Sequence, residues 1–173
     1  MNMTSAKLSV LVGEKFACLK IVGRANFASS IDFRTVISEL RKKGYAYFVL
    51  ELSECVLMDS TFLGVLAGFG LQLGAPGADD CGNGIELLNA NARIRELLET
   101  LGVLHLFRLE QGLQSMPEQG EPCTPTAAAP TREEVKRACL EAHQTLIAIN
   151  PGNAARFKDV TQFLAEDMKK PPS

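Results

Sequence analysis

The chain has 173 residues, a formal net charge of −2 and a hydrophobic content of 46%. This length suits one domain with a short extension, and the hydrophobic content is typical of a folded globular protein rather than a disordered one. The small negative charge provides no electrostatic footprint for gripping the phosphates of a nucleic acid, so no direct contact with nucleic acid is predicted.

The sequence also lacks membrane and export signals. No apolar run approaches the about 20 residues that span a bilayer, so no transmembrane segment is predicted. The N-terminus has no basic region followed by an apolar segment and a cleavage site. We therefore expect a cytoplasmic protein.

The five cysteines are an odd number and lie far apart, without the close pairs of structural zinc sites. We predict free thiols, with Cys18 and Cys55 as small core residues because their neighbours are apolar. His105 lies in an apolar run and is predicted as a core or edge residue, whereas His143, at helical spacing from Cys139, is predicted on a helix face. Neither a metal site nor a cofactor is expected.

The first elements in chain order are two β-favouring runs, Lys7 to Gly13 and Phe16 to Gly23. The turn signal Gly13-Glu14 separates them and predicts an antiparallel hairpin. From Ser29 onward, apolar residues recur at helical spacing until Gly44, and Ser29 is the predicted N-cap.

The middle of the chain alternates strands and helices. Tyr45 to Leu52 is apolar enough for a central strand covered on both faces. Asp59, Ser60 or Thr61 can cap the next helix, whose body is Phe62 to Leu73 and whose glycines favour close packing.

Three more elements follow a Gly-rich loop. Ile85 to Asn89 is a predicted strand, Asn91 caps a helix through Leu101, and Val103 to Leu109 is a last strand. The resulting order ββαβαβαβ predicts an α/β fold, a mixed β-sheet flanked by helices.

The C-terminal part begins with a Pro-, Gly- and Ala-rich linker, residues 110–130, in which no regular element is expected. Thr131 and Glu134 form a capping-box pattern for a helix to about Ile149, and a second helix runs to about Lys169. This helical hairpin either packs back on the domain or forms a dimer or partner interface. The apolar residues available for either role are Val135, Leu146, Phe157, Phe163 and Leu164.

Several motifs together resemble the STAS domain family, typified by bacterial anti-sigma factor antagonists. A strand ends in Leu50-Glu51-Leu52-Ser53 and is followed by Met58-Asp59-Ser60-Thr61-Phe62-Leu63-Gly64, similar to the family's MDSSGLG helix start. Ile85-Glu86-Leu87-Leu88-Asn89 and Leu101-Gly102-Val103 are similar to later family segments. The resemblance implies a STAS domain at 1–109, a linker at 110–130 and a C-terminal helical extension at 131–173.

In antagonist members of the family, an anti-sigma factor that is also a serine-threonine protein kinase phosphorylates the second hydroxyl of this motif. By position that hydroxyl is Thr61, with Ser60 as the second choice. Phe62 replaces a family Gly, and Asn26 stands where the family usually has an acidic residue. The implied partner-binding residues are Asn26, Asp59, Ser60, Thr61, Phe62 and Leu63.

Three functions follow from these patterns. The first is an anti-sigma factor antagonist, a non-enzymatic phosphoprotein that regulates transcription by partner switching. The second is a STAS scaffold or accessory subunit of a signalling or transport assembly, without phosphorylation. The third is an enzyme that uses Asp59 with Ser60 or Thr61, although no recognisable base and oxyanion site accompany them. In the absence of any such role, these three residues would simply cap a helix.

Overall fold

The strands in the computed structural model are β1 (Lys7–Val12), β2 (Ala17–Ala25), β3 (Tyr47–Glu51), β4 (Cys55–Met58), β5 (Gly84–Leu88), β6 (Phe107–Glu110) and β7 (Glu121–Pro122). The structure describes residues 6–13, 16–74, 84–112, 121–122 and 131–169, and within these ranges seven strands form one sheet. Their order is β6-β5-β3-β2-β1-β7, and β4 pairs with β2 beyond the end of β3. β1 runs antiparallel to both neighbours, whereas the other pairings are parallel.

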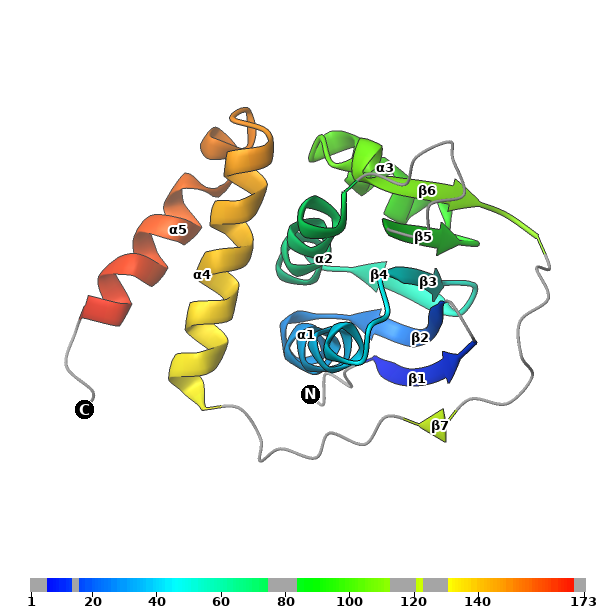
Figure 1. Cartoon of the computed structure of the whole chain (residues 1–173). Helices are drawn as coiled ribbons and strands as arrows, with labels where there is room; N and C mark the ends of the chain where they lie inside the picture. The colour runs from blue at the N-terminus through cyan, green and yellow to red at the C-terminus, as the bar shows by residue number, and fades with distance from the viewer. Residues whose placement is uncertain (1–5, 14–15, 75–83, 113–120, 123–130, 170–173) are drawn as a thin grey trace.

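The helices are α1 (Phe27–Lys42), α2 (Ser60–Leu73), α3 (Ala92–Thr100), the 3-10 turn η1 (Leu104–Leu106), α4 (Arg132–Ile149) and α5 (Asn153–Lys169). Figure 1 shows α1 and α2 against one face of the sheet, α4 on the side of α2 that faces away from the sheet, and α5 outermost. The predicted α/β class, with a mixed sheet, flanking helices and an added C-terminal hairpin, is confirmed. No helix in the described ranges is long and apolar enough to cross a membrane.

Strand alternation divides the buried residues between the two faces of the sheet. Leu19, Leu50 and Leu87 point towards α1 and α2 and are fully buried in the main core. Their neighbours Cys18 and Val49 point to the opposite face, where they join a smaller apolar cluster. The central strands are therefore covered on both faces, as predicted, and the predicted burial of Cys18 and Cys55 is also confirmed.

Several predicted boundaries are wrong. Helix α1 begins at Phe27 and its N-cap is Asn26, not Ser29, because the Asn26 side chain accepts the Ser29 backbone N–H. Strand β4 was not predicted, since its four residues follow β3 after a turn too short to separate two runs by pattern. The two-residue strand β7 lies in the predicted linker and pairs with β1.

The last predicted strand, Val103 to Leu109, is shorter than expected. Leu104 to Leu106 form η1, and β6 begins only at Phe107. His105 consequently lies in a 3-10 turn and is exposed, rather than in a strand as a core or edge residue. A helix of tight i→i+3 turns is difficult to separate from a short strand by apolar content alone.

The hairpin formed by α4 and α5 packs back on the domain. Leu146 of α4 is fully buried in the main core, and Phe157 of α5 joins the same cluster. The buried Asn153 side chain donates to the carbonyl oxygens of Leu101 (2.8 Å) and Leu146 (2.9 Å). The first bond fixes the hairpin to the end of α3, and the second holds α5 to α4 within the hairpin. Phe163 is an exception, because 68% of it is exposed.

Candidate functional site

The start of α2 is built at the carboxyl ends of two neighbouring parallel strands, β2 and β4. Ala25 pairs with Met58, and the Asp59 N–H donates to the Ala25 carbonyl at 2.9 Å. Asp59 is the N-cap of α2, because its Oδ1 accepts the Phe62 N–H at 2.8 Å. The strand pairing therefore brings the first turn of α2 next to the first turn of α1, which begins immediately after β2.

Asn26 performs the same task for α1 as Asp59 does for α2. Its Oδ1 accepts the Ser29 N–H at 3.1 Å, and Ser29 Oγ accepts the Asn26 N–H at 2.8 Å. This reciprocal pair is a capping box, which satisfies two donors that the helix itself leaves free. Asn26 thus has a structural role at the predicted site that needs an oxygen acceptor but no charge.

Phe62 and Leu63, predicted as partner contacts, are core residues. They are 0% and 1% exposed, and the Phe62 ring packs on Phe33 of α1 with 4.9 Å between ring centroids. A partner cannot reach either side chain in this packing, so their role is corrected. They hold α2 against α1 and the sheet, and thereby position the polar residues at the start of α2.

Ser60 and Thr61, the predicted hydroxyl pair, both face α4. Ser60 Oγ lies 2.8 Å from His143 Nε2, and Thr61 Oγ1 lies 3.1 Å from Cys139 Sγ. Thr61 is only 4% exposed. The structure therefore brings Asp59, Ser60 and Thr61 together, as predicted, but places two residues of the C-terminal extension directly over the hydroxyls.

The sequence analysis placed His143 on a helix face without giving it a role at the site. Its Nδ1 lies 2.6 Å from the Cys139 carbonyl oxygen. A carbonyl oxygen only accepts, so Nδ1 carries a proton, and in the neutral ring Nε2 accepts the Ser60 hydroxyl proton. Phe157 of α5 packs edge-on against the His143 ring with 4.8 Å between centroids. The i, i+4 spacing of Cys139 and His143 was the available signal, but only tertiary packing identifies Ser60 as the partner.

Burial and hydrogen bonding shift the pKa of three groups here. Burial raises the pKa of the Asp59 carboxyl, and backbone N–H groups only partly oppose it. For Cys139 burial works in the same direction, but hydrogen bonds with His143 and Thr61 outweigh it and lower the pKa of the thiol. Burial disfavours the His143 imidazolium, yet the interactions with Cys139 and the charge of Asp59 raise its pKa. The site therefore favours the imidazolium form of His143, in which both ring nitrogens carry a proton.

Small residues allow α4 to approach α2 closely. A Cβ placed on Gly64 would lie 2.4 Å from the Ala142 carbonyl oxygen, far inside van der Waals contact. One turn further on, a Cβ on Gly68 would lie 3.8 Å from Thr145 Cγ2, an ordinary contact. Four residues of α2 thus face α4, two through their hydroxyls and two through their missing side chains. We call these residues, Ser60, Thr61, Gly64 and Gly68, the switch surface.

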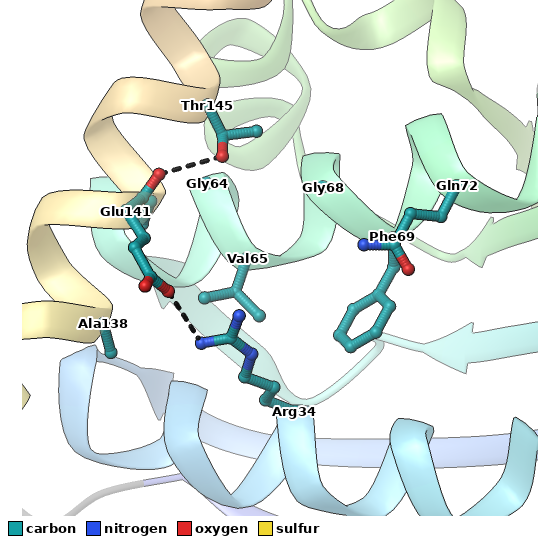
Figure 2. Close-up of a pocket in the computed structure, with 10 residues that line it drawn as sticks. Arg34, Gly64, Val65, Gly68, Phe69, Gln72, Ala138, Glu141 and Thr145 are labelled. Atoms are coloured by element: carbon teal, nitrogen blue, oxygen red, sulfur yellow. Dashed lines mark hydrogen bonds and ion pairs between the residues drawn. The ribbon is translucent and has the colours of Figure 1, made fainter. Parts of the chain in front are cut away.

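A small open pocket of about 90 Å³ lies between α1, α2 and α4, and Gly64 and Gly68 of the switch surface line it (Figure 2). An ion pair of 3.2 Å between Arg34 and Glu141 crosses it, and Thr145 donates to the Glu141 carbonyl at 2.8 Å. Neither Ser60 nor Thr61 lines the pocket. Within the part of the chain that the structure describes, the two hydroxyls face His143 and Cys139 of α4.

The chemistry of the site follows from these surroundings. A Ser hydroxyl bonded to an imidazole can act as a nucleophile when a substrate and an oxyanion site adjoin it. At Ser60 the neighbouring Phe62 N–H is already bonded to Asp59, and α4 covers the hydroxyl. This arrangement supports recognition or modification of the helix start better than catalysis.

Comparison of the sequence with models of known protein families identifies the family of this chain. The model of the STAS domain family matches residues 7–116, more than half of the chain. The chain belongs to the STAS domain family. The match ends before α4, so α4, which covers the switch surface, and α5, which packs on α4, both lie outside the STAS domain match. No curated protein matches the chain significantly by sequence.

The STAS fold is also found among solved structures. An anti-sigma factor antagonist from Mycobacterium paratuberculosis has a TM-score of 0.52 at 17% identity, with 61% of this chain and 86% of that one covered. A Thermotoga maritima protein proposed to be an anti-sigma factor antagonist has a TM-score of 0.52 at 19% identity, with coverages of 61% and 87%. At these identities the likeness concerns the STAS fold alone.

Proposed function

We propose that this STAS protein is an anti-sigma factor antagonist, a regulatory binding module of the cytoplasm. In this proposal it binds an anti-sigma factor that is also a serine-threonine kinase, through the first turn of α2. Phosphorylation of Thr61 by that kinase ends the interaction, and a sigma factor is the indirect target. Direct contact with nucleic acid has no part in this partner switching.

The observation that carries the proposal is the pair of hydroxyls directly after the Asp59 N-cap, in the position of the family motif. Ser60 and Thr61 occupy the first turn of α2. A helix N-terminus carries free N–H groups and a partial positive charge, so it accommodates a phosphate without unfolding. A phosphate adds a charge of about −1.5 to −2 and three acceptor oxygens, enough to change the fit of a partner. The fold would persist while the binding changes.

Thr61 is the preferred acceptor because it matches the modified position, and Ser60 is the second choice. The two hydroxyls have different environments, since Thr61 is almost fully buried whereas Ser60 is half-buried. With α4 in place, each hydroxyl is already hydrogen-bonded to a residue of the extension. Transfer of phosphate to either one therefore requires that α4 move away.

A second candidate is a STAS scaffold or accessory subunit that is not phosphorylated. The burial of Thr61 beneath Cys139 favours it, because a scaffold needs no access to that hydroxyl. The exposed Phe163 on α5 would then offer an apolar contact for another subunit or for a second copy in a homodimer.

Phosphate transfer separates the two candidates. The full chain is incubated with ATP and a kinase encoded beside it, and the phosphate is located by mass spectrometry. Wild type, Thr61→Ala and Ser60→Ala are compared, and we expect phosphate on wild type and Ser60→Ala but not on Thr61→Ala. Phosphate on none of the three proteins would favour the scaffold.

A further inference from the structure

The surroundings of Thr61 have no space for a phosphoryl group. Its Oγ1 lies 3.1 Å from Cys139 Sγ, and the side chain is 4% exposed. Phosphorylation adds a phosphorus atom and three oxygens to that oxygen. These atoms would occupy the volume that Cys139 fills when α4 is docked, so the modified side chain and the docked helix cannot coexist.

The contact between α2 and α4 is specific in shape. Small residues recur at a spacing of four on both helices, at Gly64 and Gly68 of α2 and at Ala138 and Ala142 of α4. The near-zero clearance between Gly64 and Ala142 means that the two backbones touch. The switch surface is thus shaped to receive a helix with small side chains, and α4 is the helix that occupies it.

The hairpin is held most firmly at the end that lies away from the switch surface. Asn153 joins the loop between α4 and α5 to the end of α3 through a buried hydrogen bond to Leu101, and a second buried bond, to Leu146, ties the same loop to α4. Near the start of α2, the polar contacts of α4 are those of Cys139 and His143, and the ion pair with Arg34 is half-exposed. Exposed ion pairs contribute little, so α4, including the part at Thr145 that faces Gly68, can pivot away from the switch surface while the loop after it stays attached.

From these observations we infer that α4 is an internal cover of the switch surface, and that docking of α4 and phosphorylation of Thr61 exclude each other. The inference rests on the proposed function, because it concerns regulation of the same site. Phosphorylation would then do more than repel a partner: it would keep the cover off the domain. Conversely, any contact that tightens α4 would slow the kinase.

A pair of matched substitutions in the full chain tests the closed state without a kinase. Gly64→Ala and Gly68→Ala change the same residue type in the same helix, but only the first collides with α4. Alkylation of Cys139, followed by peptide-resolved mass spectrometry, and hydrogen exchange of α4 report the opening. We expect Gly64→Ala to increase the alkylation rate of Cys139 and the hydrogen-exchange rate of α4 by roughly 5- to 150-fold, the usual range of coupling between sites. We expect Gly68→Ala to leave the two rates unchanged. Equal rates in the two variants would overturn the inference.

The exclusion itself is tested at Thr61. Thr61→Glu adds bulk and negative charge at the hydroxyl position, whereas Thr61→Val keeps the shape and removes only the hydroxyl. We expect Cys139 to become reactive in Thr61→Glu to about the extent seen in Gly64→Ala, and to remain protected in Thr61→Val. Protection of Cys139 and of α4 in Thr61→Glu, equal to that of wild type, would contradict the exclusion.

A crosslink separates failure of this inference from failure of the proposed function. In Gly68→Cys/Thr145→Cys, oxidised glutathione is used to join α2 to α4, while Ser60 and Thr61 stay intact. We expect the kinase to modify Thr61 only after dithiothreitol reduces the crosslink. Phosphorylation of the crosslinked protein would contradict the inference that docked α4 prevents phosphorylation of Thr61. If Gly64→Ala opens α4 yet receives no phosphate, the cover stands and the proposed function fails.

Discussion

Ser60 Oγ and His143 Nε2 lie 2.8 Å apart although 83 positions separate the two residues in the chain. One belongs to the first turn of α2 and the other to a helix outside the STAS match. This hydrogen bond, with the neighbouring contact between Thr61 and Cys139, joins the C-terminal hairpin to the proposed switch at the hydroxyls themselves. A change at the Ser60 or Thr61 hydroxyl should therefore affect how α4 docks, and undocking of α4 should expose the two hydroxyls.

Replacing His143 with Ala should loosen α4. The change removes the partner of Ser60 and the ring that packs on Phe157, both in a largely buried environment. We expect the free energy of opening of α4, measured by hydrogen exchange, to fall by about 1–3 kcal/mol. His105→Ala is the control, because His105 is exposed on η1 and should change that value by less than about 0.5 kcal/mol. Equal effects of the two substitutions would remove His143 from the contact.

The protonation of His143 gives a pH dependence. Its pKa is raised above the ordinary value of 6.5, so the folded protein binds this proton more tightly than the unfolded chain does. The stabilisation is complete below the ordinary His pKa and is lost as the pH rises through the higher folded-state value. Proton NMR titration of the two histidines, assigned with His105→Gln, should give His143 a midpoint above 6.5. A midpoint at or below 6.5 would show that the folded protein does not stabilise the protonated, imidazolium form of His143.

Asn153 should be a major determinant of how firmly the hairpin is attached. Asn153→Ala leaves the carbonyl oxygens of Leu101 and Leu146 without these two buried donors. We expect the free energy of unfolding, measured by urea denaturation, to fall by about 1–3 kcal/mol. Gln162→Ala, on the exposed side of α5, provides the comparison and should cost less than about 0.5 kcal/mol. Similar midpoints for both variants would show that the anchor is unimportant.

The role of Asn26 can be separated into capping and charge. Asn26→Ala removes the acceptor for the Ser29 N–H and should lower the free energy of unfolding by about 1 kcal/mol. Asn26→Asp keeps the acceptor and restores the acidic residue usual in the family, so its stability should stay close to that of wild type. If Asn26→Asp changes the rate of Thr61 phosphorylation at equal stability, charge at this position acts on the switch. If Asn26→Ala costs nothing, the capping box has no energetic role.

Features that depend on local chemistry could be predicted from the sequence. Asn91 and Thr131 each cap the helix assigned to them, and Asp59 is the cap among the three residues offered for α2. A short acceptor side chain before a helix satisfies an N–H within the same turn. The opening hairpin likewise follows from two β-favouring runs around a turn. Asn26 was missed as a cap because Ser29, three residues later, carries the same signal and contributes the second half of the capping box.

Features that depend on distant packing could not be predicted. Strand β4 exists because its residues pair with the end of β2, about thirty positions earlier, and a four-residue run has little pattern of its own. The contacts of Ser60 and Thr61 with α4 depend on the angle at which the extension returns across α2. The glycines of α2 indicated a close approach but not which helix approaches, and Gly64 identifies α4 only once Ala142 is placed beside it.

Helix α4 remains covalently joined to the domain whether or not it covers the switch surface. A tethered segment has an effective concentration in about the millimolar range, so it competes with outside ligands whatever the amount of protein in the cell. If about one molecule in a hundred were open, the apparent Kd of a partner would rise about a hundredfold above its intrinsic value. The extension would thereby set a threshold, and weak or scarce partners would fail to respond even when Thr61 is unmodified.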